Sequence, residues 1–201
     1  MPRRSVVIAA ALMLFAALAL GSYALLSRQV PGFTGSGTAL VGGPFTLTDQ
    51  TGKRVTEKDF LGKHMLVFFG YTFCPDVCPT ELQVMTAALD MIGPEADNIT
   101  PVFVTVDPER DTVQVMKAYV ENFGPRLVGL TGSPDEIATV AKAYRVYYAK
   151  AGKSGSPDYL MDHSSIIYLM GPNGSFVKHF TYTTDAKALA QSLKEALTGS
   201  P

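Results

Sequence analysis

Two cysteines carry the most evident chemistry in the sequence. Cys74 and Cys78 are the only cysteines among the 201 residues. Two thiols are too few to act as a disulfide scaffold for a domain of this size. Residues four apart in the first turn of a helix share one face, with Cβ atoms about 5 to 6 Å apart. Both sulfurs can therefore bind one metal ion or form a redox-active disulfide.

The spacing of the pair bears on which chemistry it carries. A thioredoxin-type redox site is Cys-x-x-Cys, and the additional residue here widens the pair towards a metal chelate while still permitting a disulfide. A helix N-terminus stabilises thiolates, which are better nucleophiles and better metal ligands than thiols. The structural alternative is that both cysteines are small buried apolar side chains or form an inert disulfide.

A metal site needs at least one more ligand, and the sequence offers His64, His163 and His179. Two thiolates and one imidazole make a soft, three-coordinate set that suits Cu(I), whereas zinc usually takes a fourth ligand. His163 follows a segment, residues 150–157, that we expect to be a mobile loop able to bring the ligand in. We expect the other two histidines to be solvated or at the edge of the core.

Hydrophobic patterning predicts the elements that position these residues. Residues 65–71 form a continuous apolar run, typical of a central buried strand, and residues 80–92 have helical spacing that ends at Gly93-Pro94. The cysteines thus lie between a strand end and a helix start, where α/β sheets bind ligands. The other predicted elements are a hairpin at 45–56, strands at 101–107, 127–130, 164–170 and 176–180, and helices at 112–123, 134–144 and 185–198.

This order of elements predicts the fold class. Two strand–helix units followed by a hairpin and a closing helix indicate an α/β, thioredoxin-like fold with an N-terminal β-hairpin. We place this domain at residues 40–201. Preceding it, residues 28–39 contain several Gly, Ser and Thr residues and predict a flexible tether.

The N-terminal segment predicts one transmembrane helix. Residues 5–27 carry no charged residue, and about 20 apolar residues cross a bilayer as a helix. Arg3 and Arg4 keep residues 1–4 in the cytoplasm, so the domain is exported. A cleaved signal peptide, with Ala19-Leu20-Gly21 as a small-residue cleavage site, is the alternative to a retained anchor.

The overall charge argues against nucleic acid as a partner. The chain has 17 Lys and Arg residues against 18 Asp and Glu residues, a net charge of -1. Binding to a phosphate backbone requires an excess of basic side chains. We therefore expect no nucleic-acid partner.

Three motifs together resemble the Sco/SenC family of copper chaperones in cytochrome c oxidase assembly. They are Cys74-Pro-Asp-Val-Cys78-Pro, Asp107-Pro-Glu-Arg-Asp-Thr112, and Asp162-His163 followed by Gly171-Pro-Asn-Gly174. The resemblance runs from about Gly43 to Leu197. It implies a membrane-anchored, thioredoxin-like domain that binds one copper ion, Cu(I) or Cu(II), through Cys74, Cys78 and His163.

The resemblance also implies a partner. Family members deliver copper to the binuclear copper centre of cytochrome c oxidase subunit II, or reduce the cysteines of that centre. Other copper chaperones and thiol–disulfide oxidoreductases are further candidate partners. A chaperone need not turn over a substrate, so the resemblance does not imply an enzyme.

Two carboxylates are candidates for supporting the ligands. Asp162 precedes His163 and is expected to orient its imidazole ring. Asp107 falls at the same sheet edge as the cysteines, where it would shape the site or dock the target. The segment from Asp107 to Thr112 is also explained as a strand end and a helix cap, without any function.

Two other functions compete with copper delivery. In a thiol–disulfide reductase, Cys74 or Cys78 attacks a target disulfide, and His163 is not required. A peroxiredoxin-type thiol peroxidase would have Thr-x-x-Cys, but Thr72 is only two residues before Cys74. The copper chaperone is therefore the favoured prediction, with the reductase as its alternative.

The short N-terminus indicates the cellular location. It has two arginines before the apolar span and no long Arg- and Ser-rich presequence. We expect a single-pass protein of the bacterial plasma membrane with its domain in the periplasm. The alternative is the mitochondrial inner membrane, with the domain facing the intermembrane space.

Overall fold

The computed structural model describes residues 41–152 and 159–199, together with Ser22. The predicted cytoplasmic end at 1–4, membrane segment at 5–27 and tether at 28–39 lie outside these residues, Ser22 excepted. Within the described parts of the chain, we find no helix with the length and apolar character needed to cross a membrane. Residues 39–201 form one compact unit.

The apolar run predicted as the central strand forms β3 (His64–Gly70), and every residue of it is buried. It pairs in parallel with β4 (Ile99–Thr105) and antiparallel with β8 (Ile166–Met170). A strand buried on both faces has this continuous apolar character. The remaining strands extend the sheet on both sides: β1 (Thr46–Asp49), β2 (Arg54–Thr56), β5 (Val128–Thr131) and β9 (Phe176–Thr181), in the order β2-β1-β5-β4-β3-β8-β9.

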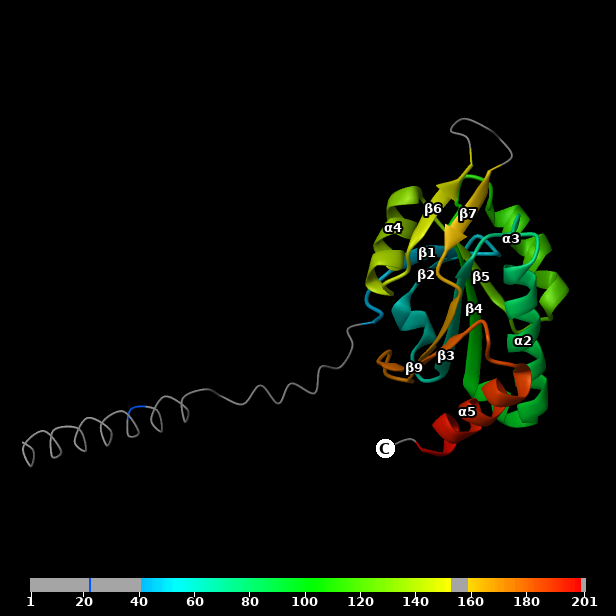
Figure 1. The fold of residues 1–201 in the computed structure, drawn as a ribbon, viewed down its shortest axis with the longest axis vertical. Helices are drawn as coiled ribbons and strands as arrows, with labels where there is room; N and C mark the ends of the chain where they lie inside the picture. Colours follow the sequence, from blue (N-terminus) through cyan, green and yellow to red (C-terminus); the bar gives the residue numbers. More distant parts are fainter. Residues whose placement is uncertain (1–21, 23–40, 153–158, 200–201) are drawn as a thin grey trace, which may run out of the picture. The chain divides into compact units, whose positions relative to one another are not determined.

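Helices cover both faces of the sheet. The longest, α2 (Val77–Ile92), lies on one side with α3 (Val113–Val120) and α5 (Ala186–Thr198), and α4 (Pro134–Ala143) lies on the other (Figure 1). Three short 3-10 helices complete the connections: η1 (Glu57–Phe60), η2 (Gly93–Asn98) and η3 (Glu121–Phe123). This confirms the predicted thioredoxin-like α/β fold and its N-terminal hairpin.

The start of α2 differs from the prediction in a way that matters for the site. The helix begins at Val77 instead of residue 80, so Cys78 lies in its first turn. Pro79 is compatible with this early start because the first N–H groups of a helix have no intrahelical partner to lose. The backbone N–H of Thr80 already donates to the carbonyl of Asp76, at 3.2 Å.

A second, two-stranded sheet was not predicted. It consists of β6 (Tyr148–Ala151) and β7 (Leu160–His163), which pair antiparallel with one another. The expectation of a loop over residues 150–157 is therefore wrong at Lys150 and Ala151, while residues 153–158 lie outside the described part. Each strand is only four residues long, too short to stand out as a pattern.

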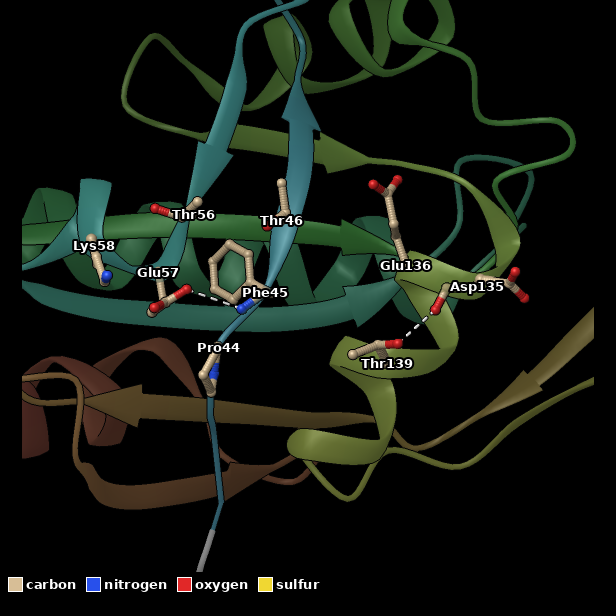
Figure 2. A pocket seen from close by; sticks show the side chains of 9 residues that line it. All are labelled: Pro44, Phe45, Thr46, Thr56, Glu57, Lys58, Asp135, Glu136 and Thr139. Atoms are coloured by element: carbon tan, nitrogen blue, oxygen red, sulfur yellow. Dashed lines mark hydrogen bonds between the residues drawn. The ribbon is translucent and has the colours of Figure 1, made fainter.

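The largest of the described cavities lies away from the predicted ligands. It has a volume of about 500 Å³ and opens between the N-terminal hairpin and α4 (Figure 2). Its lining residues are Pro44, Phe45, Thr46, Thr56, Glu57, Lys58, Asp135, Glu136 and Thr139. Neither a cysteine nor a histidine lines it, so it plays no part in the candidate site.

Candidate metal centre

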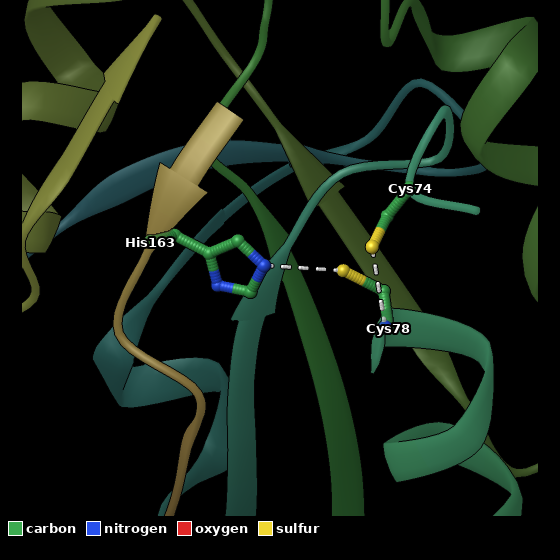
Figure 3. Close-up of side chains that lie close together, drawn as sticks. All are labelled: Cys74, Cys78 and His163. Atoms are coloured by element: carbon green, nitrogen blue, oxygen red, sulfur yellow. Dashed lines mark hydrogen bonds between the residues drawn. The ribbon is translucent and has the colours of Figure 1, made fainter. Parts of the chain in front are cut away.

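The two cysteines lie where β3 gives way to α2. Cys74 is in the connecting loop and Cys78 is in the first helical turn (Figure 3). The backbone N–H of Cys74 donates to the carbonyl of Tyr71 at 3.3 Å, and that of Cys78 donates to the Sγ of Cys74 at 3.4 Å. These bonds fold the loop so that the Cys74 sulfur lies over the helix start, where N–H groups stabilise a thiolate.

A glycine at the end of β3 makes room for the buried sulfur. Cys78 is fully buried. A Cβ atom at Gly70 would lie 2.8 Å from the Sγ of Cys78 and 2.9 Å from a ring carbon of Phe103. Both separations are shorter than side-chain contacts allow, so the absence of a side chain at Gly70 permits the sulfur to pack against the strand.

The histidine reaches the cysteines from the other sheet. His163 is the last residue of β7, and its Nε2 lies 3.3 Å from the Sγ of Cys78 (Figure 3). The rings of Phe68 and Tyr71 pack against the imidazole, with centroids at 6.1 and 5.8 Å. The Nδ1 atom lies 3.3 Å from the carbonyl oxygen of Ser164. A proton on Nε2 allows the ring to donate to the sulfurs of the metal-free site, whereas a proton on Nδ1 donates to that carbonyl and leaves the Nε2 lone pair for a metal ion.

The three residues form a compact cluster of donor atoms. One ligand atom from each of Cys74, Cys78 and His163 lies within 4.8 Å of the other two, and within residues 41–152 and 159–199 this is the single such group. The structure therefore brings together all three residues that the sequence analysis proposed as ligands. His64 is buried at the first position of β3 and His179 is exposed on β9.

The two thiols differ in acidity. Hydrogen bonds from the side chains of Cys78 and His163, with help from backbone N–H groups, lower the pKa of Cys74 to about 3. The same hydrogen bond to Cys74, together with burial, raises the pKa of Cys78. Cys74 is thus the thiolate at neutral pH, and Cys78 retains its proton.

A buried carboxylate supports the cysteine loop and was missed by the sequence analysis. Asp111 is fully buried. It accepts hydrogen bonds from the backbone N–H of Thr72 at 3.0 Å, from the Thr72 hydroxyl at 2.6 Å and from the Thr105 hydroxyl at 2.5 Å. Thr72 is two residues before Cys74, so this network fixes the start of the loop to the end of β4. Asp111 belongs to a motif already noted, but its burial was not visible in the sequence.

The two carboxylates proposed to support the ligands have different places. Asp107 is almost completely buried beside the site, where it accepts hydrogen bonds from the Nε of Arg110 and, at 2.6 Å, from the hydroxyl of Tyr159. Asp162 is exposed. Successive strand residues point to opposite faces, so Asp162 points away from the face that carries His163. The partner described for His163 Nδ1 is the Ser164 carbonyl.

The combination of this cluster with the fold agrees with a known family. The family model for SCO1/SenC matches residues 34–198. The chain belongs to the SCO1/SenC family. It is 50% identical over 159 residues to the mitochondrial SCO1 homolog 1 of Arabidopsis thaliana, a match that covers 79% of this chain and 47% of that protein. This SCO1/SenC chain spans about half the length of the curated relatives it matches.

Solved structures of SCO1/SenC relatives have the same fold. The crystal structure of Arabidopsis thaliana ScoI with copper bound matches with a TM-score of 0.75 and 48% identity, over 80% of this chain and 99% of that one. BsSco, described as a member of the Sco family of cytochrome c oxidase assembly proteins with a disulfide switch, matches with a TM-score of 0.63 and 26% identity. That match covers 82% of this chain and 98% of BsSco.

Proposed function

We propose that this SCO1/SenC protein is a copper chaperone that binds one copper ion, Cu(I) or Cu(II), through Cys74, Cys78 and His163. The observation that carries the proposal is the convergence of two sulfurs and one imidazole nitrogen within 4.8 Å. This soft donor set suits Cu(I) in three-coordinate geometry. The copper-bound structure of the Arabidopsis relative supports the same choice of metal.

The protonation of the site suits metal binding. Cys74 is a thiolate before any metal arrives, because hydrogen bonds from Cys78 and His163 lower its pKa. Cys78 releases its proton when it binds, since thiolates are the metal-binding form. His163 would bind copper through the lone pair of Nε2 once its ring proton is on Nδ1, where it donates to the Ser164 carbonyl. Copper binding therefore displaces one proton at neutral pH and needs no large movement of the ligands.

We further propose that the protein delivers copper to the binuclear copper centre of cytochrome c oxidase subunit II. The description of BsSco as one of a family of cytochrome c oxidase assembly proteins supports this assignment. Residues 5–27 would anchor the domain to the bacterial plasma membrane, facing the periplasm, because they carry no charge and follow two arginines. The mitochondrial inner membrane is the alternative location.

Copper binding is tested by anaerobic titration of the reduced full-length protein with Cu(I) against a competing chelator. We expect one tightly bound equivalent. Cys78→Ser and His163→Ala should each weaken binding by about 100-fold, at least as much as the loss of a supporting hydrogen bond in other metal sites. His179→Ala is the matched control, because His179 is an exposed histidine on β9. Binding that is unaffected by His163→Ala would contradict the proposed ligand set.

Delivery is tested by mixing the copper-loaded protein with the metal-free soluble domain of subunit II. We expect copper to leave the chaperone and to be recovered with the subunit II domain after the two proteins are separated. Absence of transfer from a protein that binds copper tightly would contradict the delivery role and leave copper binding itself standing.

A thiol–disulfide reductase is the second candidate, and the acidity of Cys74 favours it. The Cys74 thiolate would attack a target disulfide to form a mixed disulfide, which Cys78 would then resolve. The products are a Cys74–Cys78 disulfide and two thiols on the target. This reaction does not use His163 as a ligand. Reduction of a model disulfide at the wild-type rate by a protein that binds no copper would replace the chaperone assignment with this one.

A further inference from the structure

Arg110 contacts three aromatic rings from two segments around the candidate metal site, the cysteine loop and the start of β7. Its guanidinium carbon lies 3.7 Å from the ring centroid of Tyr159, 4.9 Å from that of Phe73 and 5.8 Å from that of Tyr71. Phe73 immediately precedes Cys74, Tyr71 packs against the ring of His163, and Tyr159 leads into β7. One side chain therefore connects the cysteine loop to the strand that carries the histidine.

A buried carboxylate fixes the guanidinium in this place. Asp107 is only 1% exposed and accepts hydrogen bonds from the Nε of Arg110 and from the hydroxyl of Tyr159. The Nη1 of Arg110 donates to the backbone carbonyl of Tyr159 at 2.9 Å. Burial and the bond to Asp107 raise the pKa of Tyr159 to about 12, so its hydroxyl remains a donor at physiological pH. Arg110 and Asp107 thus hold both the side chain and the backbone of Tyr159.

The position of Tyr159 relates it directly to the histidine. Residues at alternate positions of a strand share a face, so Tyr159, Met161 and His163 face the same way. Met161 is buried, whereas Leu160, on the opposite face, is 48% exposed. Contacts made by Tyr159 at one end of β7 therefore press the strand against the domain and direct His163, at the other end, towards the cysteines.

Within the described residues, the small sheet is attached to the domain by side chains and not by strand pairing. Its strands β6 and β7 pair with each other, and none of the described strands of the large sheet pairs with either of them. Near its outer end, Lys150 forms an ion pair with Glu109 at 2.6 Å, but both side chains are at least half exposed. Exposed ion pairs contribute little to stability. The buried contacts of Arg110 are therefore the main attachment of the Tyr159 end of β7, while the buried side chain of Met161 attaches its middle.

We propose that Arg110 is a positioning residue for copper binding: it holds β7 against the cysteine loop and so keeps His163 beside Cys78 before the metal arrives. This inference rests on the proposed copper function. A ligand that is already in place loses less conformational freedom on binding, which increases affinity. Arginine suits the role because its planar guanidinium donates several hydrogen bonds in fixed directions and stacks on aromatic rings, which a lysine ammonium cannot do together.

The test compares Arg110→Lys with Arg126→Lys in the full-length protein. Arg126 makes exposed ion pairs with Asp90 and Asp97, so its replacement is a matched control. We expect Arg110→Lys to weaken Cu(I) binding by about tenfold, within the range for residues that support metal ligands. The nitrogen hyperfine coupling from His163 in the Cu(II) electron paramagnetic resonance spectrum should weaken or disappear. Arg126→Lys should change neither property.

Two further variants separate positioning from a general effect on folding. Tyr159→Phe keeps the ring beneath Arg110 but removes the hydroxyl that bonds to Asp107, and it should weaken copper binding in the same direction, by less than Arg110→Lys. In a His163→Ala background, Arg110→Lys should have no additional effect on copper affinity, because it acts through the histidine. An equal loss of copper affinity from Arg110→Lys in the wild-type and His163→Ala backgrounds would overturn the inference. Wild-type copper affinity and wild-type nitrogen hyperfine coupling in Arg110→Lys would also overturn it.

Hydrogen exchange of the metal-free protein keeps this test independent of the proposed function. If Arg110 holds β7 in place, the amides of residues 160–163 should exchange about tenfold faster in Arg110→Lys, with no change in β3. Unchanged exchange in β7 would overturn the positioning role. A wild-type protein that fails to bind copper would instead overturn the proposed function, while the exchange data would still decide whether Arg110 holds the strand.

Discussion

The cysteine and histidine sides of the candidate site are built in different ways. Cys78 belongs to a long helix packed on the central strand, and its sulfur is buried against Gly70. His163 belongs to a four-residue strand in a separate two-stranded sheet, attached to the rest of the domain by side chains. The cysteine side is therefore fixed by the core of the fold, and the histidine side by a small set of polar and aromatic contacts.

Because of this difference, the cysteine and histidine ligands differ in how easily they can move away from a bound metal ion. A cysteine ligand held by the core keeps its position as long as the protein is folded. A histidine ligand on the small two-stranded sheet can move away from the metal ion without unfolding of the domain. Under the proposed delivery of copper, this arrangement places the ligand that leaves first on the part of the domain that costs least to move.

Hydrogen exchange of the metal-free protein tests the comparison most directly. We expect amides of β7 to exchange on the order of 1,000-fold faster than amides of β3, because β7 opens locally and β3 only when the whole domain unfolds. Exchange is measured residue by residue by nuclear magnetic resonance. Equal protection of the two strands would mean that the hairpin is part of the same cooperative unit.

Removing the support of the cysteine loop should affect the whole domain. Asp111→Ala leaves the hydroxyl of Thr105 and two donors of Thr72 without their buried acceptor. We expect the free energy of unfolding to fall by about 3 kcal/mol, measured by urea denaturation. The exposed Asp162 provides the control, since Asp162→Ala should change stability by less than about 0.5 kcal/mol. Similar effects of the two substitutions would contradict the role given to Asp111.

Because the two thiols differ in pKa, they should react with an alkylating reagent at different rates. With a pKa of about 3, Cys74 is a thiolate throughout the range from pH 5 to pH 8, so its rate of reaction with iodoacetamide should change less than about twofold. Cys78, buried and protonated, should react about 100-fold more slowly at pH 7. A model peptide with an ordinary thiol loses about tenfold in rate per pH unit on acidification. The same slope at Cys74 would disprove its thiolate character.

The smallest effect is expected at the exposed attachment of the hairpin. Glu109→Gln removes the ion pair with Lys150 but leaves Lys150 over the ring of Tyr159, and we expect the free energy of local opening of β7 to fall by less than about 1 kcal/mol. Hydrogen exchange of residues 160–163 measures this change. A larger effect than that of Arg110→Lys would show that the exposed ion pair, and not the buried cluster, attaches the hairpin.

The sequence predicts the two sides of the site unequally. The apolar run of β3, the helical spacing of α2 and the glycine and proline after it are local patterns, so the placement of the cysteines follows from them. The strands β6 and β7 are short, and each is recognisable only from its pairing with the other. His163 was proposed as a ligand from a family resemblance, and its strand was missed.

The contacts of the residues that support the ligands could not be predicted from the sequence either. Asp111 and Arg110 lie in a motif that helix capping already accounts for, with Thr112 as the cap that accepts from the backbone of Val115. Their burial and partners arise only when β4, the cysteine loop and β7 meet. The sequence also suggested that Asp162 orients the histidine, but alternation along β7 directs that carboxylate towards solvent.

Gly70 has a consequence for protein engineering. Grafting two cysteines and a histidine onto another α/β scaffold reproduces the donor atoms of this site. The graft also needs a strand that ends without a side chain beneath the second cysteine, because the sulfur of Cys78 occupies the space that a Cβ atom would fill. The smallest unit that can be transplanted is therefore the three ligands together with a glycine at the position of Gly70. In a design that copies only the ligands, a side chain at that position will displace the buried sulfur.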